Sequence, residues 1–253
     1  MNNAIFGQFK KPQVGTLAGK DFFLTLTQIT NFFTFVISMV GTVDGAAKIA
    51  HDVLFEFEAE PAKKERMKEE WEKRKSAAQG LSENRQFLLE VVLVRQVENF
   101  LNYLSSLLNE IFIQRPETLK SSEKIELSAV LNHNSIEDFV KTCAEKKVEA
   151  LSYASFKELR NYFEERFSLT LVTEQEFPIL NEAIEIRNIS VHERCIINNR
   201  FISKTGCDPA LKGKKKVLGI EYLEKIIDLI TSLVIEIDKE ALSELKLNGI
   251  ELE

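Results

Sequence analysis

The stretch NRQFLLEVVLVRQVENFLNYLSSLLNEIFIQ, residues 84–114, decides the fold of this chain. Its apolar side chains recur every three or four positions, which is the repeat of an α-helix with one buried face. They are Leu93, Val97, Phe100, Leu101, Leu104, Leu107, Leu108 and Ile111. Pro116 follows and cannot continue a helix, so we expect the helix to end just before it.

Further helices are expected on both sides of this central one. Three capping-box patterns, in which a Ser or Thr precedes an acidic residue by three positions, each predict a helix start. They are Ser135-x-x-Asp138, Ser155-x-x-Glu158 and Thr173-x-x-Glu176. The third helix carries Pro178 in its first turns and should run to about Arg194. A last helix is expected from about Ile220 to Leu245, and with 10 Gly and 5 Pro the chain reads as an all-α bundle.

The segment from Phe22 to Val43 contains no charged residue and is long enough to span a membrane. Threonine, glutamine, asparagine and serine side chains interrupt it, and such groups are costly in hydrocarbon. We therefore expect a buried or docking helix, with membrane association through residues 22–43 as the less favoured alternative. Gly41 and Gly45 are expected to loosen the end of this helix.

A charged segment from Glu56 to Lys75 is typical of an exposed connecting helix, which Trp71 could anchor. We expect residues 1–80 to form an N-terminal helical appendage and residues 81–253 to form the main helical domain. The first residues lack the pattern of a signal peptide. The three cysteines form no CxxC pair, which favours a reducing cytoplasm and argues against a structural zinc site.

The charge of the chain is unevenly distributed. The net charge is −6, yet residues 187–216 hold eight basic and two acidic residues. A cationic segment on an acidic protein indicates a local anion site, and a solvated lysine-rich loop is the equally weighted alternative. The basic side chains that we expect to contact RNA are Arg194, Arg200, Lys212, Lys214, Lys215 and Lys216.

The run Arg187-Asn188-Ile189-Ser190-Val191-His192 places an arginine, an amide and a histidine within reach of one another. Asn188 and His192 are four residues apart and share a helix face, so we expect the amide to hydrogen-bond the imidazole. Arg187 lies about 140° around the helix from His192. Two copies that face each other across a dimer axis would therefore make a better site than one copy.

Histidine suits proton transfer near neutral pH, and arginine suits bidentate binding of phosphate. Together they fit metal-independent cleavage of RNA, in which the 2′-hydroxyl attacks the adjacent phosphate. No HExxH motif, paired carboxylates with ligand spacing or glycine-rich phosphate loop is present, so we expect no metal and no cofactor. The alternative interpretation is that Arg187 and His192 only cap the end of a core helix.

The same residues carry a resemblance. The run from Leu180 through Arg187-Asn188-x-x-x-His192 to Ile202 is similar to the signature of HEPN domains. Residues 155–163 resemble the penultimate helix of that family, and residues 96–101 resemble its first long helix. The resemblance covers roughly residues 82–240. The residues after the motif, Asn198-Asn199, are expected to form a turn, flanked by Ile196-Ile197 and Phe201-Ile202 as a short hairpin or a packed loop.

The resemblance implies an antiparallel HEPN-like bundle with additional N-terminal helices, and a homodimer with the motif lining a composite cleft. It implies a cytoplasmic endoribonuclease of a toxin–antitoxin, abortive-infection or other anti-phage system, with an antitoxin or defence protein as a partner. Arg187 and His192 would be the catalytic pair and Asn188 the supporting polar residue. Some family members bind RNA or proteins without cutting, and a non-catalytic binding module is our alternative.

Overall fold

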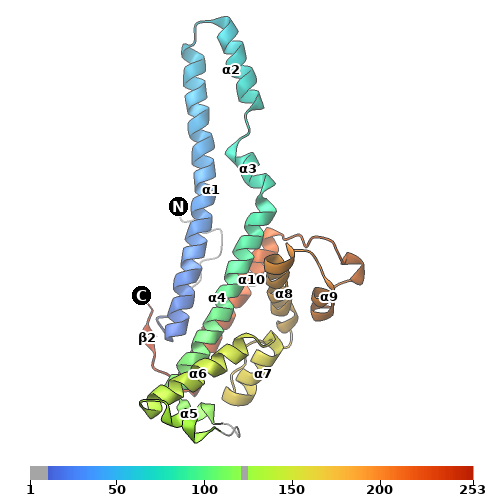
Figure 1. The fold of residues 1–253 in the computed structure, drawn as a ribbon. Helices are drawn as coiled ribbons and strands as arrows, with labels where there is room; N and C mark the ends of the chain where they lie inside the picture. Colours follow the sequence, from blue (N-terminus) through green and yellow to red (C-terminus); the bar gives the residue numbers. More distant parts are fainter. Residues whose placement is uncertain (1–10, 121–124, 253) are drawn as a thin grey trace.

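The computed structural model describes residues 11–120 and 125–252, and within them the chain is almost entirely helical (Figure 1). The helices are α1 (Leu17–Phe57), α2 (Pro61–Lys73), α3 (Ala77–Glu83), α4 (Arg85–Gln114), η1 (Pro116–Leu119), α5 (Leu127–Leu131), α6 (Ile136–Ser152), α7 (Phe156–Phe167), α8 (Phe177–Glu193), α9 (Asn199–Thr205), η2 (Pro209–Leu211) and α10 (Ile220–Glu244). Two short antiparallel strands, β1 (Val14–Gly15) and β2 (Ile250–Glu251), pair near the two ends of the chain. The predicted all-α class is confirmed.

Most predicted helix boundaries hold because they rest on local chemistry. α4 ends before Pro116, and Ser135 and Ser155 cap α6 and α7 through their hydroxyl groups. The start of α8 differs slightly from the predicted one, because the helix begins at Phe177 and not directly after Thr173. Thr173 and Glu176 exchange their capping hydrogen bonds in the turn that precedes it, with Thr173 Oγ1 donating to Glu176 over 2.6 Å.

The core is built around α4. Phe100, Leu104, Leu107 and Phe112 are fully buried along this helix. α1, α6, α8 and α10 pack on different sides of it (Figure 1). The apolar face predicted for residues 84–114 is therefore the centre of the bundle, and the helices that carry the motif and the C-terminal apolar face lie against it.

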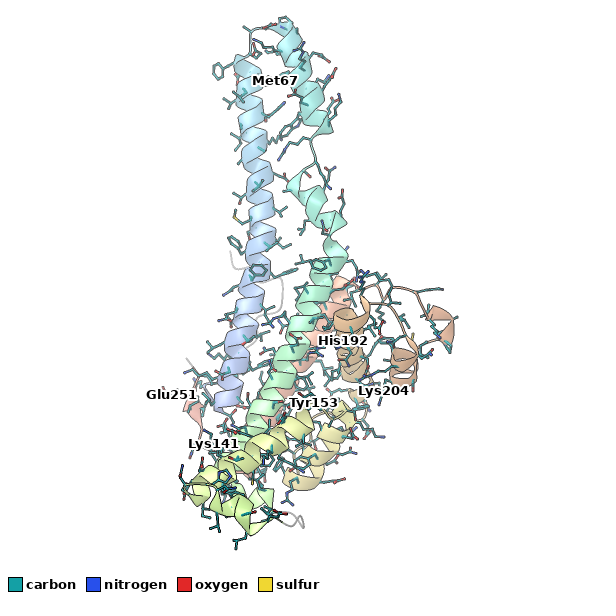
Figure 2. The ribbon with its side chains drawn as sticks, in the orientation of Figure 1. Met67, Lys141, Tyr153, His192, Lys204 and Glu251 are labelled. Atoms are coloured by element: carbon teal, nitrogen blue, oxygen red, sulfur yellow. The ribbon has the colours of Figure 1, made fainter. Side chains whose placement is uncertain are left out.

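The long first helix has two different halves. Phe22, Phe23, Leu26 and Phe33 are buried against α4 and belong to the same core as the helices after residue 80. Beyond them α1 continues as one flank of a projecting arm, with α2 and α3 on the other flank (Figure 2). Among the described helices, α1 is the one that is long and apolar enough to cross a membrane.

The expectation that Gly41 and Gly45 loosen the end of this helix is wrong, because the helix does not end there. α1 runs through both glycines to Phe57. Glycine weakens a helix interior by only about 1 kcal/mol relative to alanine, which neighbouring contacts can offset. Asp44 supplies such contacts, because its carboxylate accepts hydrogen bonds from the backbone N–H groups of Ala77 and Ala78, each 2.9 Å long. These two bonds lower the pKa of Asp44.

Side-chain contacts also hold α2 against α1 near the tip of the arm. The indole of Trp71 stacks on the imidazole of His51 with 4.3 Å between ring centroids, and the Arg74 guanidinium lies 5.0 Å from the indole. Trp71 therefore anchors α2 to α1, whereas the expected anchor was the main body. α2 itself buries no residue, in agreement with an exposed connecting helix.

Two carboxylates from distant helices hold the first turn of α1. Asp238 on α10 is buried and accepts hydrogen bonds from the backbone N–H (2.8 Å) and the hydroxyl group of Thr16. Tyr103 donates to the same carboxylate over 3.3 Å. Glu110 on α4 accepts from the Ala18 N–H over 3.2 Å. Negative charge at a helix N-terminus is stabilising, so this arrangement fixes the start of α1 on the body.

Candidate catalytic site

The motif lies on α8 and directly precedes an abrupt helix end. His192 is in the last turn, and the helix stops because Arg194 and Cys195 both adopt left-handed backbone angles, with φ of 51° and 63°. The N–H group of Cys195 donates to the Ile189 carbonyl over 2.9 Å and closes the end. Side chains other than glycine rarely occupy this region. The backbone is therefore strained immediately after the motif.

Replacement of Arg194 by glycine is expected to stabilise the protein. Glycine adopts the left-handed conformation without a Cβ clash, so Arg194→Gly should raise the free energy of unfolding by about 1 kcal/mol. Urea denaturation measures the change. Arg194→Ala is the matched control, because it removes the same exposed cation and retains the Cβ; equal stability of the two variants would contradict the argument.

Arg187 points from α8 to α4 and is held there by hydrogen bonds. Its guanidinium donates to Glu98 over 3.1 Å and to the side-chain oxygen of Asn188 over 3.1 Å. Arg95, one turn before Glu98 on α4, donates to the other oxygen of the Glu98 carboxylate over 3.3 Å. The Nε atom of Arg187 is buried without a partner among the described residues. We call Arg95, Glu98, Arg187 and Asn188 the α4–α8 polar cluster.

The expected hydrogen bond between Asn188 and His192 is not formed. Asn188 accepts from its neighbour Arg187 instead, because the guanidinium that reaches towards α4 passes beside the amide. The imidazole of His192 is exposed and makes no hydrogen bond to any residue that the structure describes. Each chain thus presents one half-buried, oriented arginine on α8. It also presents one exposed histidine, His192, on the same helix (Figure 2).

The six predicted RNA-binding cations fall into two groups. Arg194, Lys212 and Lys214 are exposed and form no ion pair within residues 11–120 and 125–252. Arg200, Lys215 and Lys216 face carboxylates of the chain: Arg200–Glu185 at 3.6 Å, Lys215–Glu90 at 2.9 Å and Lys216–Glu182 at 2.6 Å. The first group is free to meet a phosphate, whereas the second must first exchange a partner.

The segment after the motif pairs with the lysine-rich segment. Ile197 exchanges backbone hydrogen bonds with Lys214 (3.0 Å) and Gly213 (2.8 Å), and the Lys216 N–H donates to the Cys195 carbonyl over 2.9 Å. The predicted turn at Asn198-Asn199 with a flanking hairpin or loop is wrong. Asn198 caps the short helix α9, which contains Phe201, because its side-chain oxygen accepts from the Phe201 N–H over 2.8 Å. These backbone contacts hold Lys214, Lys215 and Lys216 close to the end of α8.

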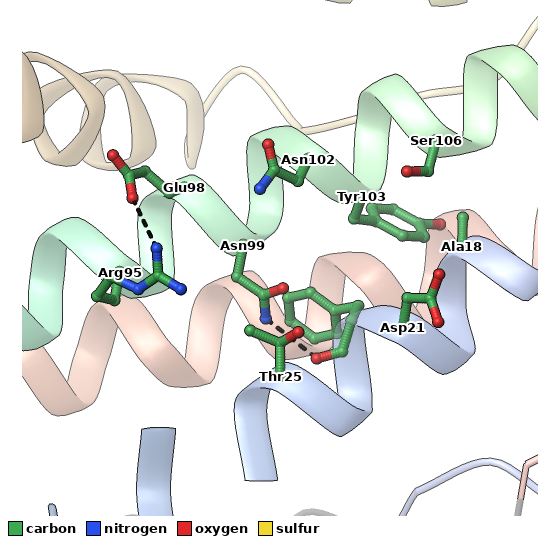
Figure 3. A pocket seen from close by; sticks show the side chains of 10 residues that line it. Ala18, Asp21, Thr25, Arg95, Glu98, Asn99, Asn102, Tyr103 and Ser106 are labelled. Carbon is green, nitrogen blue, oxygen red and sulfur yellow. Dashed lines mark hydrogen bonds and ion pairs between the residues drawn. The ribbon is translucent and has the colours of Figure 1, made fainter. Parts of the chain in front are cut away.

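A polar hollow lies next to the α4–α8 polar cluster and shares Arg95 and Glu98 with it. It has a volume of about 230 Å³ and lies between α1 and α4 (Figure 3). Arg95 and Glu98 line it together with Asp21, Thr25 and Asn102. The sequence-based prediction missed these residues. The available signal was the presence of Arg95 and Glu98, one turn apart, on the helix predicted to be the centre of the bundle.

No group of three or more His, Cys, Asp or Glu side chains within the described ranges could hold a metal ion. The three cysteines are free, and burial raises the pKa of the Cys195 thiol, which directly follows the end of α8. The chain matches no family model, no curated protein and no solved structure.

Proposed function

We propose that this protein is a cytoplasmic, metal-independent endoribonuclease of the HEPN type that acts as a homodimer, with Arg187 and His192 as its catalytic pair. The observation that carries the proposal is the contrast between these two side chains. Arg187 is oriented by Glu98 and Asn188, and His192, one and a half turns later, is exposed and unpartnered within the described chain. An oriented phosphate clamp beside a free imidazole suits phosphoryl transfer.

In the proposed reaction, the ribose 2′-oxygen forms a bond to phosphorus and the bond from phosphorus to the 5′-oxygen breaks. The His192 imidazole takes the proton of the 2′-hydroxyl, and water gives a proton to the departing 5′-oxygen. Each of the two sites of the dimer combines His192 of one protomer with Arg187 of the other. Arg187 stabilises the negative charge on the phosphoryl oxygens. The products are a 2′,3′-cyclic phosphate and a 5′-hydroxyl.

Asn188 supports this proposal in a different role from the one first expected. Its oxygen holds the Arg187 guanidinium and does not orient His192. The exposed cations Arg194, Lys212 and Lys214 support it as well, since they border the same helix end and would attract a polyanion. We also propose that an antitoxin or defence protein binds this surface and covers it.

Incubation of the purified protein with total RNA in EDTA tests the proposal. Wild type should produce fragments with 2′,3′-cyclic phosphate ends, and both Arg187→Ala and His192→Ala should lower the rate by about a hundredfold or more. His133→Ala and Arg115→Ala are the matched controls, because they remove the same residue types elsewhere. Cleavage that survives in His192→Ala would refute the catalytic role.

A non-catalytic binding module is the second candidate, and the ion pair of Glu98 with Arg187 favours it. In the isolated chain this carboxylate occupies the place that an RNA phosphate would take, at 3.1 Å from the guanidinium. A protein that binds RNA without cutting it would show salt-dependent binding and no fragments in EDTA. Host growth during expression separates the candidates, because the nuclease should arrest growth and the binding module should not.

A further inference from the structure

The side of α1 that faces away from α4 is apolar and exposed to solvent. Its large side chains lie within a strip less than half the circumference of the helix, at 100° per residue. Their exposed fractions include 64% for Phe32, 60% for Phe35 and 67% for Ile49. Met39 and Val53 are exposed on the same strip. We call this surface, from Leu24 to Phe57, the α1 stripe; no charged residue lies on it before Glu56.

The α1 stripe has the spacing of a coiled-coil seam. Starting at Phe32, its residues follow at intervals of three, four, three, four, three and four positions. They are Phe32, Phe35, Met39, Thr42, Ala46, Ile49 and Val53. This 3–4 alternation makes two helices pack along a shared line, whereas a helix that lies on a flat apolar surface needs only a broad face. The spacing therefore indicates another helix as the occupant.

We propose that the occupant is the α1 stripe of a second copy of this chain, packed antiparallel about a two-fold axis between Val40 and Gly41. In this register Phe35 lies opposite Ala46 of the other copy, and Phe32 lies opposite Ile49. Each bulky side chain thus meets a smaller one, which fills the interface evenly. A parallel arrangement would place Phe35 against Phe35 and leave a void between the two Ala46 side chains.

Charge favours the same orientation. Asp52 and Glu56 border the α1 stripe near its C-terminal end, and Glu56 continues the 3–4 spacing. Parallel helices would bring the two copies of Glu56 together, and like charges in a seam are destabilising. In the antiparallel register the two copies of Glu56 lie near opposite ends of the paired helices, so they do not repel each other.

The size of the surface is sufficient for a specific dimer. The α1 stripe is about 50 Å long at 1.5 Å per residue and roughly 10 Å wide, so self-pairing would bury on the order of 1,000 Å² or more in total. Lipid is a poorer occupant. The opposite side of α1 is committed to the core, with the polar hollow of Asp21 and Arg95 beside it, and the border of the stripe is acidic instead of basic.

Pairing through the α1 stripe is separate from the proposed pairing of the α8 motifs. It would set the two bodies at opposite ends of the joined arms, with the motif faces free (Figure 1). A protein that uses both surfaces would form assemblies larger than a dimer. The inference therefore goes beyond the proposed nuclease activity and stands independently of it.

Sedimentation velocity of the full chain across a concentration series tests the pairing. Wild type should associate, and Phe35→Glu should weaken association by about a hundredfold, since it buries charge in the centre of the interface. Lys48→Gln changes the net charge equally on another face of α1 and should leave association unchanged. A wild-type monomer at all concentrations, or association that withstands Phe35→Glu, would overturn the proposal.

Cross-linking tests the orientation. A mixture of Phe32→Cys and Ile49→Cys chains should form a mixed disulfide dimer on oxidation, whereas the chain without an added cysteine should not. Parallel helices would place these positions about 25 Å apart, so disulfides of Phe32→Cys chains with one another would overturn the antiparallel register. Flotation of a monomeric wild type with phosphatidylcholine–phosphatidylglycerol vesicles would overturn the proposal in favour of a lipid surface.

Discussion

A mixture of the Arg187→Ala and His192→Ala variants is expected to cleave RNA, although neither variant should do so alone. The proposed dimer combines Arg187 of one protomer with His192 of the other in each of two sites. A mixed dimer of the two variants therefore contains one site with both side chains intact. After random exchange half of the dimers are mixed, so the mixture should recover about a quarter of the wild-type rate. A fluorogenic RNA assay in EDTA measures it.

The double variant Arg187→Ala/His192→Ala supplies the control for this experiment. A dimer of one wild-type and one double-variant chain has no intact site, so excess double variant should suppress wild-type cleavage. If both catalytic groups acted within a single chain, two results would change together. The single variants would fail to complement each other, and the double variant would leave wild-type cleavage intact.

Asp238→Ala is expected to lower the free energy of unfolding by about 1–3 kcal/mol, the cost of leaving buried polar groups without their hydrogen-bond partner. The substitution leaves the N–H and hydroxyl groups of Thr16 and the hydroxyl of Tyr103 without their acceptor in the interior. Urea denaturation followed by circular dichroism measures the loss. Asp228→Ala removes an exposed carboxylate from the same helix and should change stability by less than about 0.5 kcal/mol. Equal effects would contradict the assigned role.

The same carboxylate gives stability a defined pH dependence. Burial raises the pKa of Asp238 above its ordinary 3.8, in spite of its hydrogen bonds with Thr16 and Tyr103. Between 3.8 and the raised value the folded protein binds more protons than the unfolded chain, so its stability falls as pH rises through this window. Thermal melts of wild type and Asp238→Asn across this range should show a shallower decline in the variant. Parallel curves would contradict the assignment.

The features that the sequence predicts well are those set by neighbours along the chain. The apolar face of α4, its stop before Pro116 and the caps Ser135 and Ser155 all depend on residues within a few positions. The motif on α8 also lies at the end of its helix as expected. The HEPN-type arrangement, the catalytic roles and the division at residue 80 stay predictions.

The features that were missed depend on long-range contacts. Glu98, which pairs with Arg187, is 89 positions away in the chain, and nothing in the local pattern of α4 connects it to the motif. The continuation of α1 past Gly41 and Gly45 depends on Asp44 reaching the start of α3, 33 positions on. Asn198-Asn199 was expected to form a turn, but Asn198 caps α9, a helix that is also held by contacts with α8.

The hydrogen bonds between Thr16 and Asp238 also determine the order in which the chain can fold. They join residues 222 positions apart, so a ribosome makes the apolar α1 well before its acceptor on α10. Synthesis at about 5–20 residues per second leaves α1 without this cap for roughly ten seconds or more. During this interval the first turn of α1 lacks its buried acceptor, so the final docking of this turn on the body waits for the synthesis of a single aspartate.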